Sequence, residues 1–239
     1  MEMIEAKKNF LFEKIFSFYN SHIIKKHFNS IRIKGENNLR DLGKNLPTII
    51  YANHSNWWDG LIAFYLSYKR WKKDAYIIME EKQLNIYRFF IKLGAFSIDK
   101  SSLRKSYDAI LYSINLLQNS EKTLWIFPQG EMLPYQTRPI KFYNGISKIV
   151  SEIKDVNIIP VTFSYEYIKE QRPEILINIG HRIKYDNTDI KEFTEFLKER
   201  MLDLLEDVNL CILKSNFEEF TIVFKGKKSS SEIIDKIKK

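Results

Sequence analysis

Short apolar runs recur along this chain and alternate with segments whose apolar residues follow a helical period. The runs have the length of buried strands and lie at 48–52, 75–79, 95–98, 123–127, 158–163 and 175–179. One intervening segment carries Leu103, Tyr107, Ile110, Ile114 and Leu117 on one helical face, and another helix is expected over roughly 188–206. Apolar strands separated by amphipathic helices predict an α/β fold, with a mixed, mainly parallel central sheet flanked by helices.

The two ends of the chain suggest how the chain is organised. Helical spacing from about residue 4 to 28 puts Phe12, Ile15, Phe16, Tyr19 and Ile23 on one side, and Glu13, Lys14, Asn20, Ser21 and Lys25 on the other. Such a helix suits a membrane interface, and it suits equally a helix packed on the core. Strands are expected at 31–34 and 217–224. We therefore divide the chain into an N-terminal amphipathic helix (1–29), a main domain (30–225) and a basic tail (226–239).

Composition and charge narrow the function classes. Hydrophobic residues make up 44% of 239 residues, enough for one sizeable core, and the single Cys211 excludes an internal disulfide. The chain has no signal-peptide pattern and no run near the ~18–20 apolar residues of a transmembrane helix. The net charge of +8 suits anionic lipid, acidic cofactors or nucleic acid, but no nucleic-acid motif is present. We expect a peripheral protein at the cytoplasmic face of a membrane, with no nucleic-acid partner.

A histidine and an aspartate follow the run at 48–52. His54 and Asp59 are separated by four residues, at a predicted strand-to-helix corner. Such corners expose reactive side chains in α/β folds, and a carboxylate beside histidine makes the imidazole a candidate general base. An alternative is that Asn56 caps the helix with Asp59 in its first turn, which would leave His54 an ordinary, partly buried histidine.

Three further segments adjoin strand ends: 93–100, 127–131 and 156–161. Together with the His54 corner, they resemble the four sequence blocks of the glycerolipid acyltransferases of the lysophosphatidic acid acyltransferase type. Asn53-His54 to Asp59 matches the first block, Gly94 to Lys100 the second, Phe127-Pro128-Gln129-Gly130 the third, and Ile159-Pro160-Val161 the fourth. The blocks occur in the family's order over roughly 46–180.

The resemblance implies an enzyme in which His54 and Asp59 are catalytic. It implies that substrate is bound by Asn56, Gly94, Lys100, Phe127, Pro128, Gln129 and Gly130. The third block departs from the usual Phe-Pro-Glu-Gly-Thr-Arg, because Gln129, Glu131 and Met132 replace its Glu, Thr and Arg. A phosphate prefers fixed positive donors, so Arg138 is a candidate substitute for the missing arginine. Lys100 stands where the second block usually has arginine.

These observations predict an O-acyltransferase that moves a fatty acyl group from acyl-CoA or acyl carrier protein to a hydroxyl of a lipid acceptor. His54 acts as general base, Asp59 orients it, and backbone N–H groups at the helix start or at Gly130 receive the oxyanion. No metal or cofactor is required. The acceptor is either 1-acyl-glycerol-3-phosphate or a lipid without phosphate. The alternative from another class is a non-catalytic lipid-binding or membrane-docking protein of the same fold.

Overall fold

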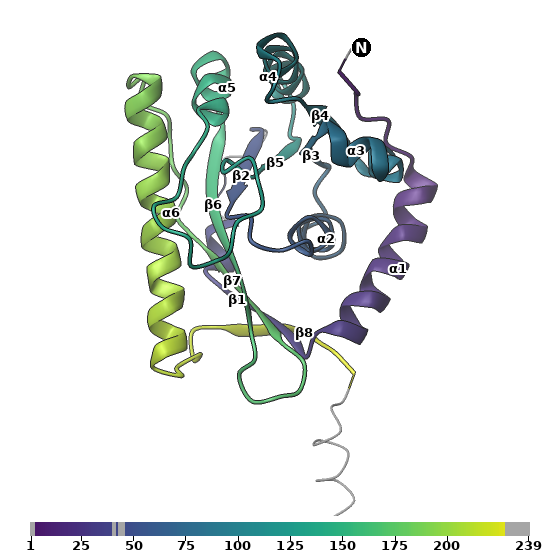
Figure 1. Cartoon of the computed structure of the whole chain (residues 1–239), viewed down its shortest axis with the longest axis vertical. Coiled ribbons are helices and arrows are strands. Elements are labelled where there is room, and N and C mark those ends of the chain that lie inside the picture. Colours follow the sequence, from purple (N-terminus) through teal and green to yellow (C-terminus); the bar gives the residue numbers. More distant parts are fainter. Residues whose placement is uncertain (1–2, 40–41, 43–45, 228–239) are drawn as a thin grey trace, which may run out of the picture.

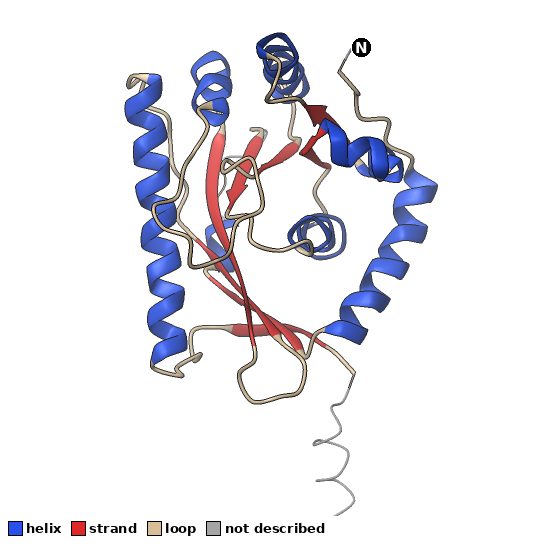
Figure 2. Ribbon diagram, in the orientation of Figure 1, coloured by secondary structure: helices blue, strands red, loops and turns tan. Residues whose placement is uncertain are grey.

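The apolar runs form the middle of an eight-stranded sheet that has helices on both faces (Figures 1 and 2). The structure is a computed structural model and describes residues 3–39, 42 and 46–227. The strands are β1 (Ser30–Lys34), β2 (Thr48–Ala52), β3 (Ala75–Glu80), β4 (Ala95–Ile98), β5 (Thr123–Ile126), β6 (Asn157–Glu166), β7 (Glu174–Ile179) and β8 (Thr221–Lys225). The predicted mixed, mainly parallel sheet is therefore confirmed.

The strand order is β4-β3-β5-β2-β6-β7-β1-β8. Every pairing from β4 to β6 is parallel, and so is that of β1 with β7. The pairings β6–β7 and β1–β8 are antiparallel. The carboxyl ends of β4, β3, β5, β2 and β6 consequently lie along one edge of the sheet, where ligands bind in open α/β folds.

The helices cover the two faces of the sheet. The α-helices are α1 (Phe10–His27), α2 (Asp59–Phe64), α3 (Glu81–Ile86), α4 (Leu103–Leu117), α5 (Gly145–Ile153) and α6 (Ile190–Leu213); short irregular helices span η1 (Glu36–Leu39), η2 (Tyr65–Trp71) and η3 (Arg88–Leu93). Side chains of α4, α5 and α6 share one buried cluster, whereas those of α1, α2 and η2 share the cluster on the other face.

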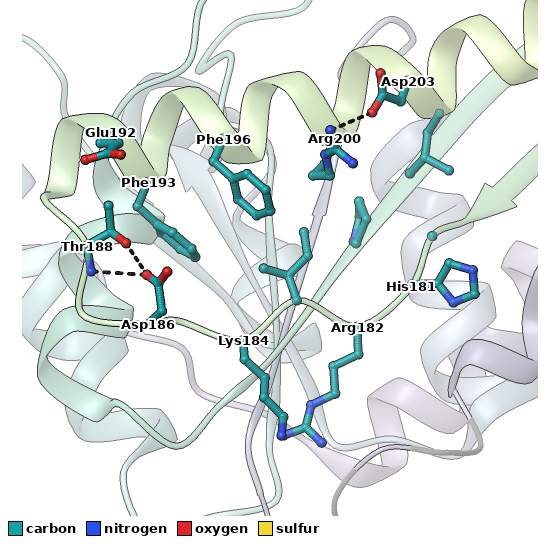
Figure 3. Close-up of a pocket in the computed structure, with 14 residues that line it drawn as sticks. His181, Arg182, Lys184, Asp186, Thr188, Glu192, Phe193, Phe196, Arg200 and Asp203 are labelled. Atoms are coloured by element: carbon teal, nitrogen blue, oxygen red, sulfur yellow. Dashed lines mark hydrogen bonds and ion pairs between the residues drawn. The ribbon is translucent and has the colours of Figure 1, made fainter.

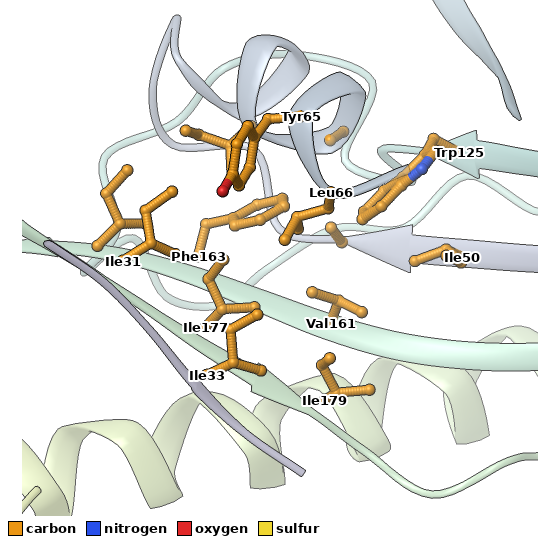
Figure 4. Close-up of a cluster of buried hydrophobic side chains, with 14 of the residues drawn as sticks. Ile31, Ile33, Ile50, Tyr65, Leu66, Trp125, Val161, Phe163, Ile177 and Ile179 are labelled. Carbon is orange, nitrogen blue, oxygen red and sulfur yellow. The ribbon is translucent and has the colours of Figure 1, made fainter. Parts of the chain in front are cut away.

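The cluster beneath α2 consists largely of β-branched and aromatic side chains. In Figure 4, Ile50, Val161 and Ile177 point from three neighbouring strands toward Leu66 and Tyr65 of the α2–η2 segment. Each of these aliphatic side chains is 0 or 1% exposed. Burial of this kind contributes about 1.5–3 kcal/mol for each large side chain, so it fixes α2, and the corner before it, against the sheet.

The N-terminal helix differs from its prediction in two respects. It begins at Phe10 rather than near residue 4, because the chain before it runs extended beside β4, where Ile4 and Ser97 exchange hydrogen bonds. Its inner face includes Glu13 and Asn20, which were expected on the solvent side. Asn20 Nδ2 donates to the Leu61 carbonyl at 2.9 Å, and Glu13 forms an ion pair with Lys8 at 2.9 Å.

The opposite face of α1 is apolar and exposed. Leu11, Ile15, Phe18 and Tyr19 lie at helical spacing and are each 58–65% exposed. Ile15 and Tyr19 were expected on the same side as Phe16, which is buried, so that part of the predicted face is wrong. The helix thus packs on the core through one side and presents large apolar side chains on the other. Of the predicted basic tail, residues 228–239 lie outside the described residues.

Candidate active site

The corner after β2 is joined to the neighbouring strand by a side chain. Regular pairing of β2 with β6 ends at Ala52 and Val161. Beyond it, Asn53 Nδ2 donates to the Phe163 carbonyl at 3.0 Å, and Asn53 Oδ1 accepts from the Phe163 N–H at 2.8 Å. The amide of Asn53 therefore continues the ladder by one step, and the following residue, His54, leaves the sheet at its carboxyl edge.

His54 and Asp59 form a hydrogen-bonded pair. His54 Nδ1 lies 2.8 Å from Asp59 Oδ2. The His54 side chain is 23% exposed, whereas that of Asp59 is fully buried. Since a carboxylate only accepts, Nδ1 carries the proton in this pair, and Nε2 is left as an acceptor. The arrangement can remove a proton from a bound hydroxyl.

The helix does not begin as the capping alternative requires. It starts at Asp59 itself, and the chain before it folds back on the Asp59 carboxylate. The N–H groups of Ser55 and Asn56 donate to Asp59 Oδ2 at 2.8 and 2.9 Å. Asn56 Oδ1 in turn accepts from the Trp58 N–H at 3.2 Å. Asn56 therefore shapes the turn that holds the pair.

Three backbone N–H groups near the expected oxyanion position are already engaged within the chain. The N–H groups of Ser55 and Asn56, just before the helix, both bond Asp59. The Gly130 N–H donates to the Phe127 carbonyl at 3.0 Å. Of the two expected positions, the Gly130 N–H is therefore not free to receive an oxyanion in this structure.

The third block lies directly against His54. The Phe127 ring stacks on the imidazole, with centroids 4.4 Å apart and planes 21° apart. Gln129 is buried, and its Oε1 accepts from the backbone N–H of His54 at 2.7 Å. Pro128 is buried between them, and its carbonyl accepts from the Tyr143 N–H at 2.8 Å. The block therefore supports the histidine from two sides.

The second block meets the third at its lysine. Lys100 Nζ donates to the Gly130 carbonyl and lies 5.8 Å from the centre of the Tyr143 ring. Gly130 has a φ of +71°, and a Cβ on it would lie 2.7 Å from that ring. Glycine is required here by both the backbone conformation and the contact. Lys100 supplies a positive charge beside the block that lacks its arginine.

Two sequence candidates lie apart from this cluster. Gly94 precedes β4, at the amino end of the strand, where it adjoins Ala75 and Lys8; the structure does not bring it to His54. Arg138 is exposed, and its guanidinium donates to the carbonyls of Tyr135 and Thr137. It does line a small hollow together with Ser55 and Gln129, so it borders the site on its far side.

Sequence reasoning missed Tyr165. Its hydroxyl donates to Asp59 Oδ1 at 2.6 Å. Side chains alternate along a strand, so Val161, Phe163 and Tyr165 share the face of β6 that looks toward α2. The alternation can be read from the sequence and places Tyr165 on this face. Its hydrogen-bond partner, Asp59, cannot be read from the sequence.

A hollow of about 600 Å³ lies away from the pair, between α6 and the chain after β7. Figure 3 shows Phe193 and Phe196 reaching from α6 toward the segment that carries Arg182 and Lys184. None of the residues discussed around His54 lines it. Within the described ranges, no His, Cys, Asp and Glu side chains gather as a metal-ligand cluster, and no helix is long and apolar enough to cross a membrane.

The segment that carries all four blocks matches known proteins. The model of the acyltransferase family matches residues 30–164. A 1-acyl-sn-glycerol-3-phosphate acyltransferase from Streptococcus pneumoniae (strain ATCC BAA-255 / R6) is 30% identical over 154 residues, 62% of this chain and 53% of the relative. The chain thus matches about half the length of that relative. The crystal structure of the 1-acyl-sn-glycerophosphate (LPA) acyltransferase PlsC from Thermotoga maritima has a TM-score of 0.62 and 15% identity, covering 82% of this chain and 79% of that one.

Proposed function

The chain belongs to the acyltransferase family, and from this premise we propose that it transfers a fatty acyl group from a thioester to a hydroxyl of a glycerolipid. The observation that carries the proposal is the His54–Asp59 pair, 2.8 Å apart, with the imidazole partly exposed at the carboxyl edge of the sheet. The pair lies inside the matched segment and leaves Nε2 as an acceptor.

That geometry supports the following reaction. Nε2 of His54 takes the proton of the acceptor hydroxyl while its oxygen attacks the thioester carbonyl. The tetrahedral intermediate collapses with cleavage of the C–S bond, and His54 returns the proton to the leaving thiolate. Asp59 holds the imidazole and stabilises its charged form. General-base catalysis of this kind is typically worth about 10²–10⁴ in rate.

For the acceptor, we propose 1-acyl-glycerol-3-phosphate first, because the curated relative at 30% identity carries that name. Lys100 beside Gly130 is the cation that supports phosphate binding in place of the missing arginine. A lipid without phosphate is the second candidate, because Met132, where the family usually has arginine, is 47% exposed and apolar.

A matched pair of acceptors separates the two candidates. Purified protein is given palmitoyl-CoA, or palmitoyl-acyl carrier protein, with either 1-oleoyl-glycerol-3-phosphate or 1-oleoyl-glycerol. Transfer to the phosphorylated acceptor, weakened through KM by Lys100→Met, supports the first candidate. Equal or better transfer to 1-oleoyl-glycerol, insensitive to Lys100→Met, supports the second. No transfer with either donor and either acceptor contradicts the proposed function.

We further propose that the protein works at a membrane surface. The exposed Leu11, Ile15, Phe18 and Tyr19 form one apolar face of α1. Lysines border that face, since Lys14 and Lys25 lie on the same helix and Lys69 Nζ is 5.0 Å from the Phe18 ring centre. An apolar face edged by cations suits the interface of an anionic bilayer. The helix also packs against Leu61 of α2, so docking places the His54 corner near the lipid.

A further inference from the structure

The buried carboxylate of Asp59 is held by four donors that divide unequally between its two oxygens. His54 Nδ1 and the N–H groups of Ser55 and Asn56 all bond Oδ2. Among the described residues, the Tyr165 hydroxyl donates a hydrogen bond to Oδ1, at 2.6 Å. Three donors hold Oδ2. The bond from Tyr165 holds the second oxygen, Oδ1, and so defines the plane of the carboxylate.

The fold gives Tyr165 this position through β6. The last residues of β6 extend beyond the end of β2 and pair only with β7, up to Glu166 opposite Glu174. The Asn53 amide anchors Phe163 on that extension, two residues before Tyr165. The Tyr165 ring also lies against the Phe28 ring, with centroids 5.8 Å apart. Backbone pairing and ring contact together aim the hydroxyl at Asp59.

We propose that Tyr165 is a positioning residue: it locks the Asp59 carboxylate so that the His54 imidazole keeps the orientation and tautomer in which Nε2 accepts a proton. This inference rests on the proposed role of His54 as general base. Tyr165 need not touch substrate, because it acts through Asp59.

The protonation of Tyr165 agrees with a donor role. Burial raises the pKa of its phenol well above the usual value, and the negative charge of Asp59 raises it further. The hydroxyl therefore keeps its proton over the whole range in which an acyl thioester assay is run, and it donates to Asp59 throughout.

The variant Tyr165→Phe removes the hydroxyl and keeps the ring on Phe28. Losing a hydrogen bond to a charged group should lower kcat by about 10–100-fold, with KM unchanged because the acceptor and donor sites are intact. The matched control is Tyr51→Phe. Tyr51 is a fully buried tyrosine of β2 whose hydroxyl donates to the Leu197 carbonyl at 3.0 Å, so its loss affects stability and leaves kcat unchanged.

A double-mutant cycle distinguishes positioning from a general structural effect. If Tyr165 acts only through Asp59, Tyr165→Phe costs little further activity in an Asp59→Asn background. The inference is overturned if Tyr165→Phe keeps wild-type kcat. It is also overturned if the loss is as large in Asp59→Asn as in the wild type, or if Tyr51→Phe loses as much.

A measurement without substrate keeps the inference testable if the proposed function fails. Proton NMR with ¹⁵N-labelled histidine, assigned through His54→Ala, reports the solvent exchange of the His54 Nδ1–H. In the wild type, we expect the His54 Nδ1–H to exchange more slowly than the ring N–H of the exposed His181. In Tyr165→Phe the His54 Nδ1–H should exchange much faster, whereas in Tyr51→Phe it should exchange as in the wild type. Equal exchange in wild type and Tyr165→Phe overturns the inference. Transfer that is undiminished by His54→Ala contradicts the proposed function instead, and the exchange result still decides what Tyr165 does.

Discussion

Gln129 Oε1 accepts a hydrogen bond from the backbone N–H of His54 at 2.7 Å. The family usually has glutamate at this position of the third block. Here the side chain is 5% exposed and turned toward the histidine backbone, so its role in this structure is to accept one buried N–H. Amide and carboxylate oxygens both do this. The departure from the family pattern therefore removes no contact that the His54 corner needs, and it gives no support to a non-catalytic protein.

We expect Gln129→Glu to keep both stability and activity, since the acceptor oxygen remains. Gln129→Leu leaves the His54 N–H buried without a partner and should lower the free energy of unfolding by about 1–3 kcal/mol. It should also lower kcat, because the corner that carries His54 is no longer fixed. Urea unfolding and acyl-transfer kinetics of both variants test this. Equal stability of Gln129→Leu and Gln129→Glu would contradict it.

The Phe127 ring stacks on one face of the His54 imidazole and restrains it; the two ring centroids are 4.4 Å apart. Phe127→Leu keeps most of the apolar volume and removes the stacking. Aromatic pairs contribute about 0.5–1.5 kcal/mol beyond their burial, so kcat should fall by roughly 3–10-fold. Phe196→Leu on α6 is the matched control, because that ring lies near Arg200 and away from His54. A Phe127 variant as active as the control would show that stacking does not matter.

The core and the order of the elements could be predicted from the sequence, because both depend on local patterns. The apolar run at 48–52 is β2, and the helical spacing from Leu103 to Leu117 gives the bounds of α4. The inner face of α1 could not be predicted this way. Asn20 is buried because it meets a carbonyl of α2, and Glu13 because it meets Lys8, and neither partner is visible in a helical pattern.

The candidate site, too, could be predicted from the sequence only in part. His54 and Asp59 were identified by their spacing after a strand, and the structure brings them together. Gly94 was assigned by block similarity alone, although a residue that precedes a parallel strand lies at the edge opposite the ligand site. Tyr165 is 106 residues from Asp59 along the chain, so only the tertiary structure reveals that contact.

The pH dependence of stability tests whether the charge of Glu174, a residue of β7, stabilises the fold. Burial raises the pKa of its carboxyl, but hydrogen bonds from Arg32, Ser30 and Asn29 and the charge of Arg32 outweigh this, and the net pKa is lowered. A lowered folded-state pKa stabilises the protein above the unfolded pKa of about 4.3, and this stability is lost as the pH falls through the folded value.

Glu174→Gln should therefore lower the free energy of unfolding at neutral pH by about 1–3 kcal/mol, and this gap should shrink between about pH 5 and about pH 3. Glu195→Gln on the exposed face of α6 is the matched control and should change little. Urea unfolding across this pH range gives both curves. A gap that is constant with pH would show that the Glu174 charge does not stabilise the fold.

The exposed face of α1 predicts how the protein meets lipid. Replacing Phe18 by Ser removes a side chain that is 62% exposed, and its transfer to the interface is worth about 1.5–3 kcal/mol. Binding to vesicles with anionic lipid should weaken by roughly 10–100-fold. Leu213→Ser is the matched control, because Leu213 is 79% exposed and belongs to α6, which lies on the other side of the molecule from α1 in Figure 1. Vesicle sedimentation measures this binding. If Phe18→Ser binds the vesicles as strongly as the wild type and Leu213→Ser do, this face is excluded from docking.

The proposed function depends most directly on His54. Thiol release from palmitoyl-CoA in the presence of 1-oleoyl-glycerol-3-phosphate is measured for wild type, His54→Ala and the exposed His181→Ala, with folding checked by thermal unfolding. Loss of the general base should lower kcat by about 10²–10⁴-fold in His54→Ala, while His181→Ala matches wild type. Acceptor-dependent thiol release by His54→Ala at the wild-type rate would contradict the account.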